Sequence, residues 1–526
     1  GERKYHGKAL RPLQWMTLLA MLFLNAASFA DNLSQAYEKA YFLETAKGQT
    51  EEALEIYRQI AATDATDENR TVITKTLKRM LEIYALAQPP VGVPAQMYIQ
   101  GIDMVRLGQK LQAAALFREA LDQVDQDDTA GKPELKEPLL KELLRIAVEN
   151  RNEKDITHYQ CRLISETDWA IADLFPAEYN NGIVHVPEGI FKGTKLHNKL
   201  ENLTIEGELT IRGVNRDECI LVRSKDGSLL RALNDAKATF DSLTLKSQIM
   251  DTEKGQGCGI WIENSAATVT NCAFIALGDN ERSPYAVGVR GYSVARFIDC
   301  YFKGYGGAFG ILDKAEVEIK NCVIQGSGMG IKINQTKKLT VENCFITGTR
   351  TPVFGSGSII NVQNNLLLNN EQGISHWMEE GEIKNNALIN CGAGIDVEAN
   401  GSLDSKRIFV HNNLVMGASG KTPSAQGDIA AISITGNIVF NEPGIPEAQR
   451  FGNAFPANNT YWAGSQTFSS NILAQSSNSF FEDPHFTDPQ NGDFTPQNPE
   501  VLNAGHGLTD PAAIQALWEK YEEACK

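Results

Sequence analysis

The sequence lacks an excess of positive charge, and it lacks closely paired cysteines. Its 49 Lys and Arg residues are outnumbered by 65 Asp and Glu residues, which gives a net charge of −16. A chain this acidic has no general affinity for nucleic acid or anionic membranes, so we expect no nucleic-acid partner. The nine cysteines include no Cys-x-x-Cys pair and therefore indicate neither a dense disulfide framework nor a zinc ribbon.

A long apolar run is also missing. The run MTLLAMLFLNAA at residues 16–27 is well short of the roughly twenty residues of a membrane-spanning helix. Basic residues precede this run, and the small residues Ser28 and Ala30 follow it, as in a signal peptide. We predict a signal peptide over residues 1–30 and an exported protein that is periplasmic, cell-surface or extracellular, with no transmembrane anchor after cleavage. An uncleaved anchor is the alternative.

Residues 31–170 are predicted to form an α-helical domain. In segments such as GQTEEALEIYRQI and LGQKLQAAALFREAL, the apolar residues recur at three- and four-residue spacing. Two triplets of residues share one spacing: Gly48, Ala53 and Tyr57, and Gly108, Ala113 and Phe117. Each triplet resembles the turn and second helix of a tetratricopeptide unit, in which a small residue lets two helices approach and an aromatic ring fills the gap. A generic helical bundle is the alternative.

After about residue 183 the helical periodicity gives way to short repeated units. VENCFITG at 341–348 and VQNNLLLN at 362–369 align with Cys and Asn at the same position. That fourth position recurs at intervals of 21 to 28 residues: Cys272, Cys300, Cys322, Cys344, Asn365, Asn386, Asn413 and Asn437. A repeat near 22 residues indicates a solenoid, in which equivalent residues of successive coils stack at the roughly 4.8 Å spacing of neighbouring strands.

A second motif, beginning Gly-Ile or Gly-Val, keeps step with the first, as in GIWIEN at 259 and GIKINQ at 330. We predict two strands per turn and a mainly β fold, a parallel β-helix over residues 171–510. We expect stacked asparagine amides at the corner to hydrogen-bond to each other and to backbone, and buried free thiols to stack in the same column. Asn471 is expected to be the last residue of this column. The helix expected at 511–526 caps the end of the β-helix.

These repeats resemble the pectin-lyase-like superfamily of right-handed β-helices. The resemblance also rests on the segment VHVPEGIFKGTKLHNKLENLTIEGELTIRGVN at 184–215 and on FFEDPHFTDPQNGDFTPQNPEVLNAG at 480–505. It implies a groove along one parallel sheet in which a polysaccharide lies. The superfamily includes lyases, hydrolases, epimerases and non-catalytic surface proteins, and no local motif here matches one lyase family, so the fold does not name the reaction.

Alternation along the second motif predicts which side chains face outward. The first expected column is Trp261, Arg290, Leu312, Lys332, Phe354, Ser375 and Asp396. The second expected column is Glu263, Tyr292, Lys314, Asn334, Ser356, Trp377 and Glu398. The aromatic members are candidates for stacking on sugar rings: Trp261, Tyr292, Phe354 and Trp377.

One hypothesis is an exported enzyme that cleaves an acidic polysaccharide by β-elimination. Such a reaction needs positive charge beside the uronate and a base for the neighbouring C–H proton. The basic candidates are Arg290, Lys314 and Lys332. The carboxylates of Asp396, Glu398 and Glu263 are candidate ligands for Ca²⁺, the one cofactor that the residues suggest.

Other functions remain open from the residues alone. Asp396 and Glu398, about 6.6 Å apart along one strand face, would suit an inverting glycoside hydrolase, although such pairs are common on solvated strands. His376 is expected to point inward and to be buried rather than to act as a base. The second hypothesis is a non-enzymatic surface or envelope protein that binds glycan or protein, with the helical domain as its docking module. The loops at 277–286 and 398–407 are candidate walls of a groove.

Overall fold

The computed structural model describes most of the chain after the predicted signal peptide. The described residues are 32–61, 63, 70–86, 94–126, 133–192, 203–223, 228–248, 258–277, 285–399, 407–418, 424–427, 431–440, 458–462 and 479–521. Two compact units divide the chain, Gly1–Tyr159 and Gln160–Lys526, here called the helical unit and the β unit. Within the described ranges, no helix is long and apolar enough to cross a membrane. The predicted signal peptide lies outside them.

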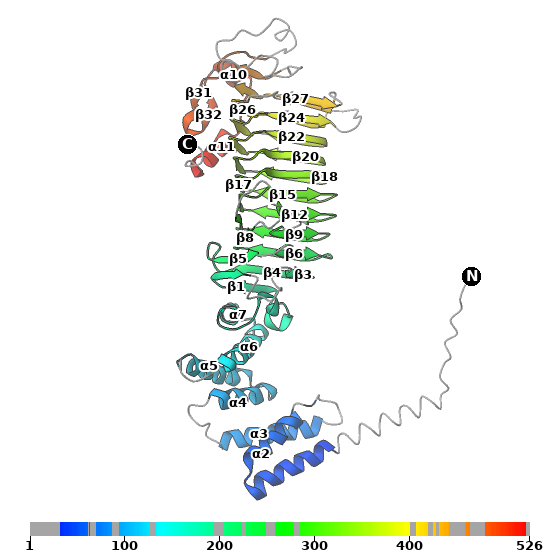
Figure 1. The fold of residues 1–526 in the computed structure, drawn as a ribbon, viewed down its shortest axis with the longest axis vertical. Coiled ribbons are helices and arrows are strands. Elements are labelled where there is room, and N and C mark those ends of the chain that lie inside the picture. Colours follow the sequence, from blue (N-terminus) through cyan, green and yellow to red (C-terminus); the bar gives the residue numbers. More distant parts are fainter. Residues whose placement is uncertain are drawn as a thin grey trace, which may run out of the picture. The chain divides into compact units, whose positions relative to one another are not determined.

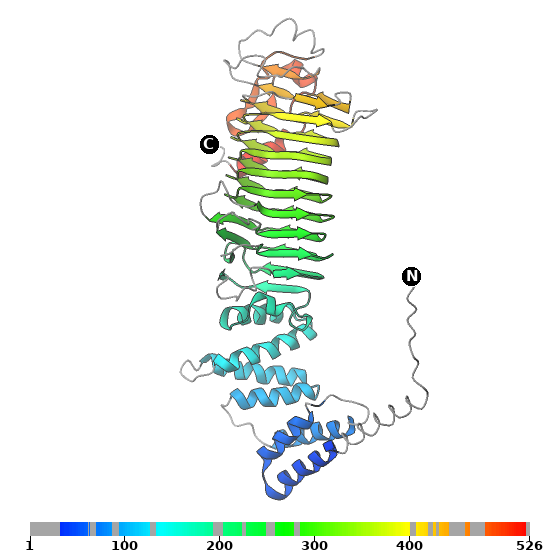
Figure 2. The same ribbon diagram turned by 45° about the vertical axis from the view of Figure 1, so that its right-hand side comes forward.

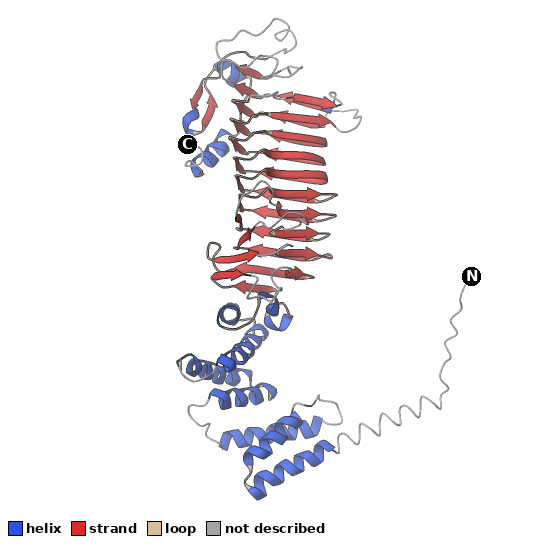
Figure 3. Cartoon of the chain, in the orientation of Figure 1, coloured by secondary structure: helices blue, strands red, loops and turns tan. Residues whose placement is uncertain are grey.

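Helices precede the strands along the chain (Figure 3). They run over residues 32–47, α2 Thr50–Ala61, α3 Arg70–Leu86, α4 Pro94–Arg106, α5 Lys110–Gln126, α6 Pro133–Glu149 and α7 Glu153–Glu166. Short 3₁₀ turns follow at Ile171–Leu174 and Ala177–Tyr179. This confirms the predicted N-terminal helical region.

Three of the helix-to-helix turns share one backbone geometry. Gly48, Gly108 and Arg151 have φ angles of 64°, 77° and 53°, and in each turn the next amide donates to a carbonyl five or six residues earlier. This is the left-handed conformation that ends helices and that glycine adopts without strain. The sequence pattern found the two glycine turns and missed the third, because arginine occupies it.

A small residue admits an aromatic ring between helices α4 and α5. A Cβ atom added at Gly101 would lie 2.3 Å from Cε1 of Phe117, so only glycine fits beneath this ring. Phe117 is fully buried, as is Tyr57 in the equivalent place of the first helix pair. The close approach of α4 and α5 therefore depends on Gly101, which is not one of the residues in the two predicted triplets.

The β unit is a parallel solenoid with three faces, seen as stacked strands in Figures 1 and 2. The first face comprises β3 Leu203–Ile205, β6 Leu230–Leu233, β9 Ile260–Glu263, β12 Tyr285–Arg290, β15 Gly307–Leu312, the first parts of β18 Met329–Glu342, β20 Thr351–Gln363 and β22 Ile374–Lys384, then β24 Ile395–Ala399 and β27 Ser424–Gly427. The second face comprises β1 Ile183–Val186, β4 Glu208–Gly213, β7 Lys237–Asp241, β10 Ala266–Thr270, β13 Val294–Ile298, β16 Glu316–Lys320, the later parts of β18, β20 and β22, then β25 Ile408–His411 and β28 Ile432–Thr435.

The third face is a separate sheet. It comprises β2 Gly189–Lys192, β5 Cys219–Arg223, β8 Thr244–Gln248, β11 Ala273–Leu277, β14 Tyr301–Lys303, β17 Val323–Gln325, β19 Phe345–Thr347, β21 Leu366–Leu368, β23 Ala387–Ile389, β26 Leu414–Met416, β29 Ile438–Phe440 and β30 Thr460–Trp462. The expectation of two strands per turn was therefore wrong. The repeated unit around Cys or Asn contains two strands, one on each side of a two-residue corner.

That corner has a fixed backbone conformation. The residue before each buried Cys or Asn has φ near 50°, for example 48° at Asn271, 57° at Asn364 and 55° at Asn412. Asparagine tolerates this left-handed region better than other residues with a side chain, and this accounts for the frequent Asn before the corner column. The next residue then turns its side chain into the core, where Asn386 and Asn413 are fully buried.

The predicted amide ladder is confirmed. Nδ2 donates to Oδ1 of the next coil at 2.9 Å from Asn365 to Asn386, at 3.0 Å from Asn386 to Asn413, and at 2.9 Å from Asn413 to Asn437. The ladder continues from Asn437 to Asn459 at 2.9 Å. Asn459, which the sequence pattern missed, is thus the next anchor, while the expected Asn471 lies outside the described residues.

Below the amide ladder the same column holds thiols. Cys272, Cys300, Cys322 and Cys344 are free and buried, as predicted. Burial raises the pKa of the Cys272 and Cys322 thiols well above the usual value. The two halves of the column join where the Cys344 amide donates to Oδ1 of Asn365 at 2.8 Å. Each thiol fills a small apolar site, so the change from amide to sulfur does not interrupt the stack.

The C-terminal segment covers the outside of the third face instead of capping the end of the stack, contrary to expectation. It contains β31 Phe486–Asp488, β32 Asp493–Pro496, α10 Pro499–Asn503 and α11 Pro511–Lys520, with a 3₁₀ turn at Pro489–Asn491. Its buried residues Phe494, Ile514 and Trp518 pack against Phe345 and Leu366 of the third face. The apolar outer side of this face supplies the reason, since alternation there places leucines and phenylalanines outward as well as inward.

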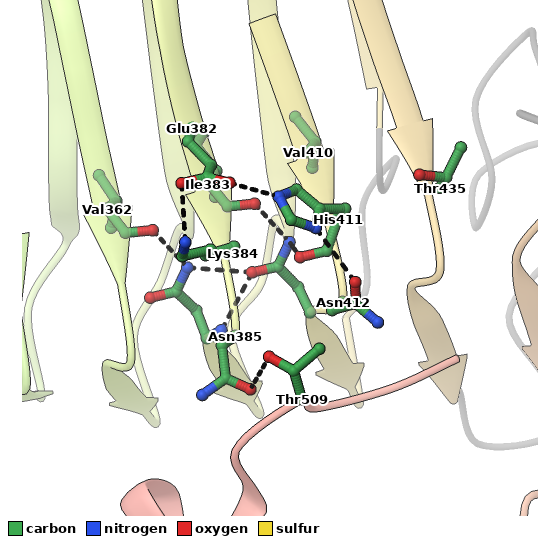
Figure 4. Close-up of polar contacts among 12 residues, drawn as sticks. Val362, Glu382, Ile383, Lys384, Asn385, Val410, His411, Asn412, Thr435 and Thr509 are labelled. Atoms are coloured by element: carbon green, nitrogen blue, oxygen red, sulfur yellow. Dashed lines mark hydrogen bonds and ion pairs between the residues drawn. The ribbon is translucent and has the colours of Figure 1, made fainter. Parts of the chain in front are cut away.

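Hydrogen bonds fix the segment to the corners. The amide of Asp510 donates to Oδ1 of Asn385 at 2.9 Å, and Thr509 contacts the same oxygen (Figure 4). Asn412 donates to the carbonyl of Gly505 at 2.7 Å. The left-handed asparagines thus serve two purposes, turning the coil and binding the C-terminal backbone.

We predict that Asn386→Ala lowers the free energy of unfolding of the β unit by about 3 kcal/mol, because it leaves several buried groups unpaired. The partners affected are the Asn365 amide, the Asn413 side chain and the Val362 carbonyl. Urea unfolding followed by circular dichroism measures the change. Asn361→Ala, on the partly exposed second face, is the matched control and should cost little. Equal effects of the two substitutions would contradict a stabilising ladder.

Candidate functional site

The strand register of the first face differs from the expected outward columns. Trp261 lies opposite Gly288, and Gly310 lies opposite Lys332. Arg290 lies opposite Glu263 on one side and in register with Leu312 on the other. The expected columns were therefore displaced by two residues in β12 and β15, although they hold from Lys332 through Phe354 and Ser375 to Asp396.

Two glycines in mid-strand explain the displacement. A Cβ atom at Gly288 would lie 2.4 Å from Cε3 of Trp261, and one at Gly310 would lie 2.9 Å from Cδ2 of Tyr285. The two rings thus lie on bare backbone of the neighbouring coil. Both glycines begin a copy of the Gly-Ile or Gly-Val motif, so alternation counted from them misplaced the outward residues of β12 and β15. Tyr285 precedes that motif and was missed as an aromatic residue of this face.

The other candidates of these two coils lie at or beyond the ends of the strands. Tyr292 follows the end of β12 and is 77% exposed, and Lys314 follows the end of β15 and is also exposed. Arg290 forms an ion pair with Asp313, with Nε 3.0 Å from Oδ2, and both side chains are about half exposed. The basic candidates therefore do not converge, and only Lys332 stands directly beside an aromatic residue of the face.

The most developed cluster lies on β20, β22 and β24. The rings of Phe354 and Trp377 meet edge to face with centroids 5.3 Å apart. The indole N–H of Trp377 donates to a carboxylate oxygen of Glu398, its neighbour in register on β24. All three side chains are half-buried. A rigid aromatic surface with a fixed carboxylate at its edge results.

The same combination recurs on β9. Nε1 of Trp261 donates to Oε2 of Glu263 at 3.1 Å, within one strand. Glu263 is separated from Glu398 by six strand spacings, or about 29 Å at roughly 4.8 Å each. Glu263 therefore cannot share a calcium ion with Asp396 and Glu398. Across the described residues, no group of three or more His, Cys, Asp or Glu side chains is arranged to hold a metal ion.

Asp396 and Glu398 are neighbours on one side of β24, as expected from alternation. Both are half-buried, next to Ser375 and Trp377 of β22. The loop segments that would wall a groove here and at the other end of the face, 400–406 and 278–284, lie outside the described residues. The pair is thus placed beside the aromatic cluster.

The second face has a different chemistry. Glu382 contacts Lys384 at 2.9 Å and His411 at 2.7 Å, and Figure 4 shows these three side chains joined in one network. Partial burial alone would raise the pKa of Glu382. The hydrogen bonds from Lys384 and His411 lower it by more, so the net shift of the Glu382 pKa is downward. Lys320 likewise bridges Glu318 and Glu342. Charges here neutralise one another across neighbouring strands.

Comparison with known proteins identifies the architecture. A family model described as "Right handed beta helix region" matches residues 258–439. Together with the parallel solenoid, this makes the β unit a right-handed β-helix and confirms the predicted fold class. No curated protein matches the chain.

Two solved structures are similar to part of it. One is a mannuronic acid specific polysaccharide family 6 lyase from human gut microbiota, with 12% identity, a TM-score of 0.33, and coverage of 65% of this chain and 93% of that one. The other is the catalytic unit of a thermostable GH87 alpha-1,3-glucanase from Streptomyces thermodiastaticus strain HF3-3, with 12% identity, a TM-score of 0.34, and coverage of 59% and 64%.

His376 is buried inside the β-helix, as predicted. Its Nδ1 lies 3.1 Å from the carbonyl oxygen of Gly355, and its Nε2 has no hydrogen-bond partner in the described part of the chain. Burial lowers the pKa of His376 to about 4, against the raising effect of the bond to Gly355. The ring is therefore neutral near pH 7 and inaccessible to a polysaccharide on the outer face, and a role as a base is wrong.

The buried histidine predicts a pH dependence of stability. An unfolded chain binds a proton at His376 below about pH 6.5, whereas the folded chain does so only below about pH 4. The free energy of unfolding therefore decreases by roughly 3 kcal/mol as the pH is lowered from about 6.5 to about 4. His376→Leu should remove that part of the slope, measured by urea unfolding at about pH 7 and about pH 4.5. His485→Leu, at an exposed histidine, is the control. An unchanged slope in His376→Leu would contradict the assignment.

Proposed function

We propose that the β-helix binds a polysaccharide chain along the outer side of its first face, between β9 and β24. The cluster of Phe354, Trp377 and Glu398 carries this proposal. Aromatic rings stack on the apolar faces of sugars, and a fixed carboxylate at the ring edge accepts hydrogen bonds from sugar hydroxyls. The rings of Trp261 and Tyr285, seated on glycine backbone, extend the same surface along the stack.

The arrangement favours an extended ligand over a single sugar. Aromatic side chains stand at both ends of the face, and Lys332 stands between them, opposite Gly310 and Phe354. A uronate carboxylate bound over Phe354 would pair with Lys332, which supports an acidic polysaccharide. Asp396 and Glu398 would instead meet hydroxyl groups beyond the uronate, because two carboxylates repel one another.

Cleavage by β-elimination is the enzymatic form of this proposal. Lys332 would pair with the uronate or, as a neutral amine, take the proton from the carbon beside its carboxylate. The electrons of that C–H bond would form a carbon–carbon double bond, and the glycosidic C–O bond would break, its oxygen taking a proton from water. Arg290, paired with Asp313 and about 12 Å from Lys332 by two strand spacings and a two-residue offset along the strand, is a weaker contributor. This separation of the basic residues favours the second candidate, a binding protein that does not cleave its ligand.

We further propose that the protein is exported and that the helical unit is a tetratricopeptide-like docking module. The basic, apolar and small-residue segments at residues 1–30 support export. Three helix pairs with one turn geometry, at Gly48, Gly108 and Arg151, support the module. Each unit would then have its own ligand, a glycan for the β unit and a protein for the helical unit.

We predict that Trp377→Ala weakens polysaccharide binding about ten-fold, the loss expected when one stacking surface is removed. Affinity electrophoresis in gels containing pectate, alginate, chondroitin sulfate or heparan sulfate measures it. Phe409→Ala is the matched control, since Phe409 is an exposed aromatic residue on the second face. If both variants migrate like the parent protein in a gel that retards the parent, the first face is not the binding surface.

Lys332→Gln separates binding from cleavage. The ultraviolet absorbance of unsaturated uronate ends, with and without calcium, reports β-elimination by the parent protein. If product forms, Lys332→Gln should reduce its rate more than a hundred-fold, in keeping with the loss of a base or of the charge on the uronate. Lys338→Gln, an exposed lysine on the later part of β18, is the control. Retention of glycan without product would establish the binding protein, and a fully active Lys332→Gln would remove Lys332 from the mechanism.

A further inference from the structure

The helical unit contains a cleft that the glycan proposal does not use. It has a volume of about 630 Å³ and lies among α2, α4 and α6. Clefts of several hundred Å³ are the size that proteins use for small ligands or a few side chains of a peptide. Its lining combines arginines on three helices with an apolar wall.

A buried carboxylate organises the charged side of the cleft. Asp103 is 1% exposed, and it lies between Arg58 on α2, at 3.9 Å from Nε, and Arg106 on its own helix, at 3.5 Å from Nη1. A charge this deep is stable only when paired, so it holds both guanidinium groups at the cleft. Arg145 approaches from α6, where Glu142 lies 3.3 Å from its Nη1.

The three arginines face two acids, Asp103 and Glu142, in the lining. The cleft is thus locally cationic on a chain whose net charge is −16. A guanidinium carries five N–H donors and can bind a second carboxylate while keeping the first. An incoming carboxylate therefore suits the charged side without displacing Asp103.

Apolar side chains of α4 complete the lining of the cleft. Tyr98, Ile102 and Val105 line it, with Ile99, which is 37% exposed. Tyr98 is held in place by Phe117, with ring centroids 5.8 Å apart, above the close approach at Gly101. A ligand that fills this cleft needs an aliphatic or aromatic group beside its carboxylate.

We propose that the cleft binds a peptide segment of a partner protein in which Asp, Glu or a terminal carboxylate stands next to Leu, Ile or Phe. The carboxylate binds Arg106 and Arg145, and the apolar side chain packs on Ile99 and Tyr98. Charge complementarity selects this occupant, because a basic segment would meet three arginines. A free small anion would leave the apolar wall exposed.

The test uses the whole chain and two pools of fluorescein-labelled octapeptides. One pool is randomised among Leu, Ile, Phe, Asp and Glu, and the other has Lys and Arg in place of the acids. Fluorescence anisotropy should show saturable binding of the acidic pool alone. Ile99→Glu should raise the Kd at least about ten-fold by adding a repelling charge to the apolar wall, and Arg145→Glu should shift preference to the basic pool.

Matched controls keep the test independent of folding and of the glycan face. Leu111→Glu adds the same charge at a leucine of α5 that is 74% exposed and outside the cleft, and it should leave the Kd unchanged. Lys75→Glu reverses an exposed charge on α3 and is the control for Arg145→Glu. Binding of neither pool, or equal loss in Leu111→Glu and Ile99→Glu, would overturn the proposal. So would self-association of the chain abolished by Ile99→Glu, which would make a second copy the occupant.

Discussion

Each asparagine of the corner ladder is bonded in both directions along the stack. Asn386 receives two hydrogen bonds from Asn365, and its own amide groups donate to Asn413 and to the carbonyl of Val362. A shift of any coil by one residue would move a buried amide to the outside and leave these partners unpaired. The ladder therefore fixes the register of all three faces, including the outward columns on which any binding surface depends.

How far the sequence predicts this structure depends on whether a position is defined locally. The corner residues were predictable because the same two requirements, a left-handed residue and then a small buried one, recur in every coil. The outward columns failed at Gly288 and Gly310, which are glycines for a different reason, the rings of Trp261 and Tyr285 that cover them. Sequence alone does not distinguish a glycine that turns the chain from a glycine that makes room.

The C-terminal segment and the helical cleft illustrate the same limit over longer distances. Trp518 and Phe345 are far apart in the chain and meet only because the segment folds back along the third face. Asp103 has no sequence signal of its own, since its role depends on Arg58 from another helix. Spacing identified the turns at Gly48 and Gly108, but three helices had to be placed together before a cleft with arginines on one side existed.

The first and second faces of the solenoid differ in how their charged side chains are paired. On the second face, Glu318, Lys320 and Glu342 stand in neighbouring strands and satisfy one another, so a ligand would have to break existing pairs. On the first face, the polar atoms of Glu263 and Glu398 are oriented by indole N–H groups that leave further lone pairs of each carboxylate for other donors. Aromatic area is added there without a compensating charge network. A hydroxyl-rich ligand would gain more from such a face than from one whose charges are already paired, and Lys332, beside Phe354, would add a positive charge for an acidic ligand.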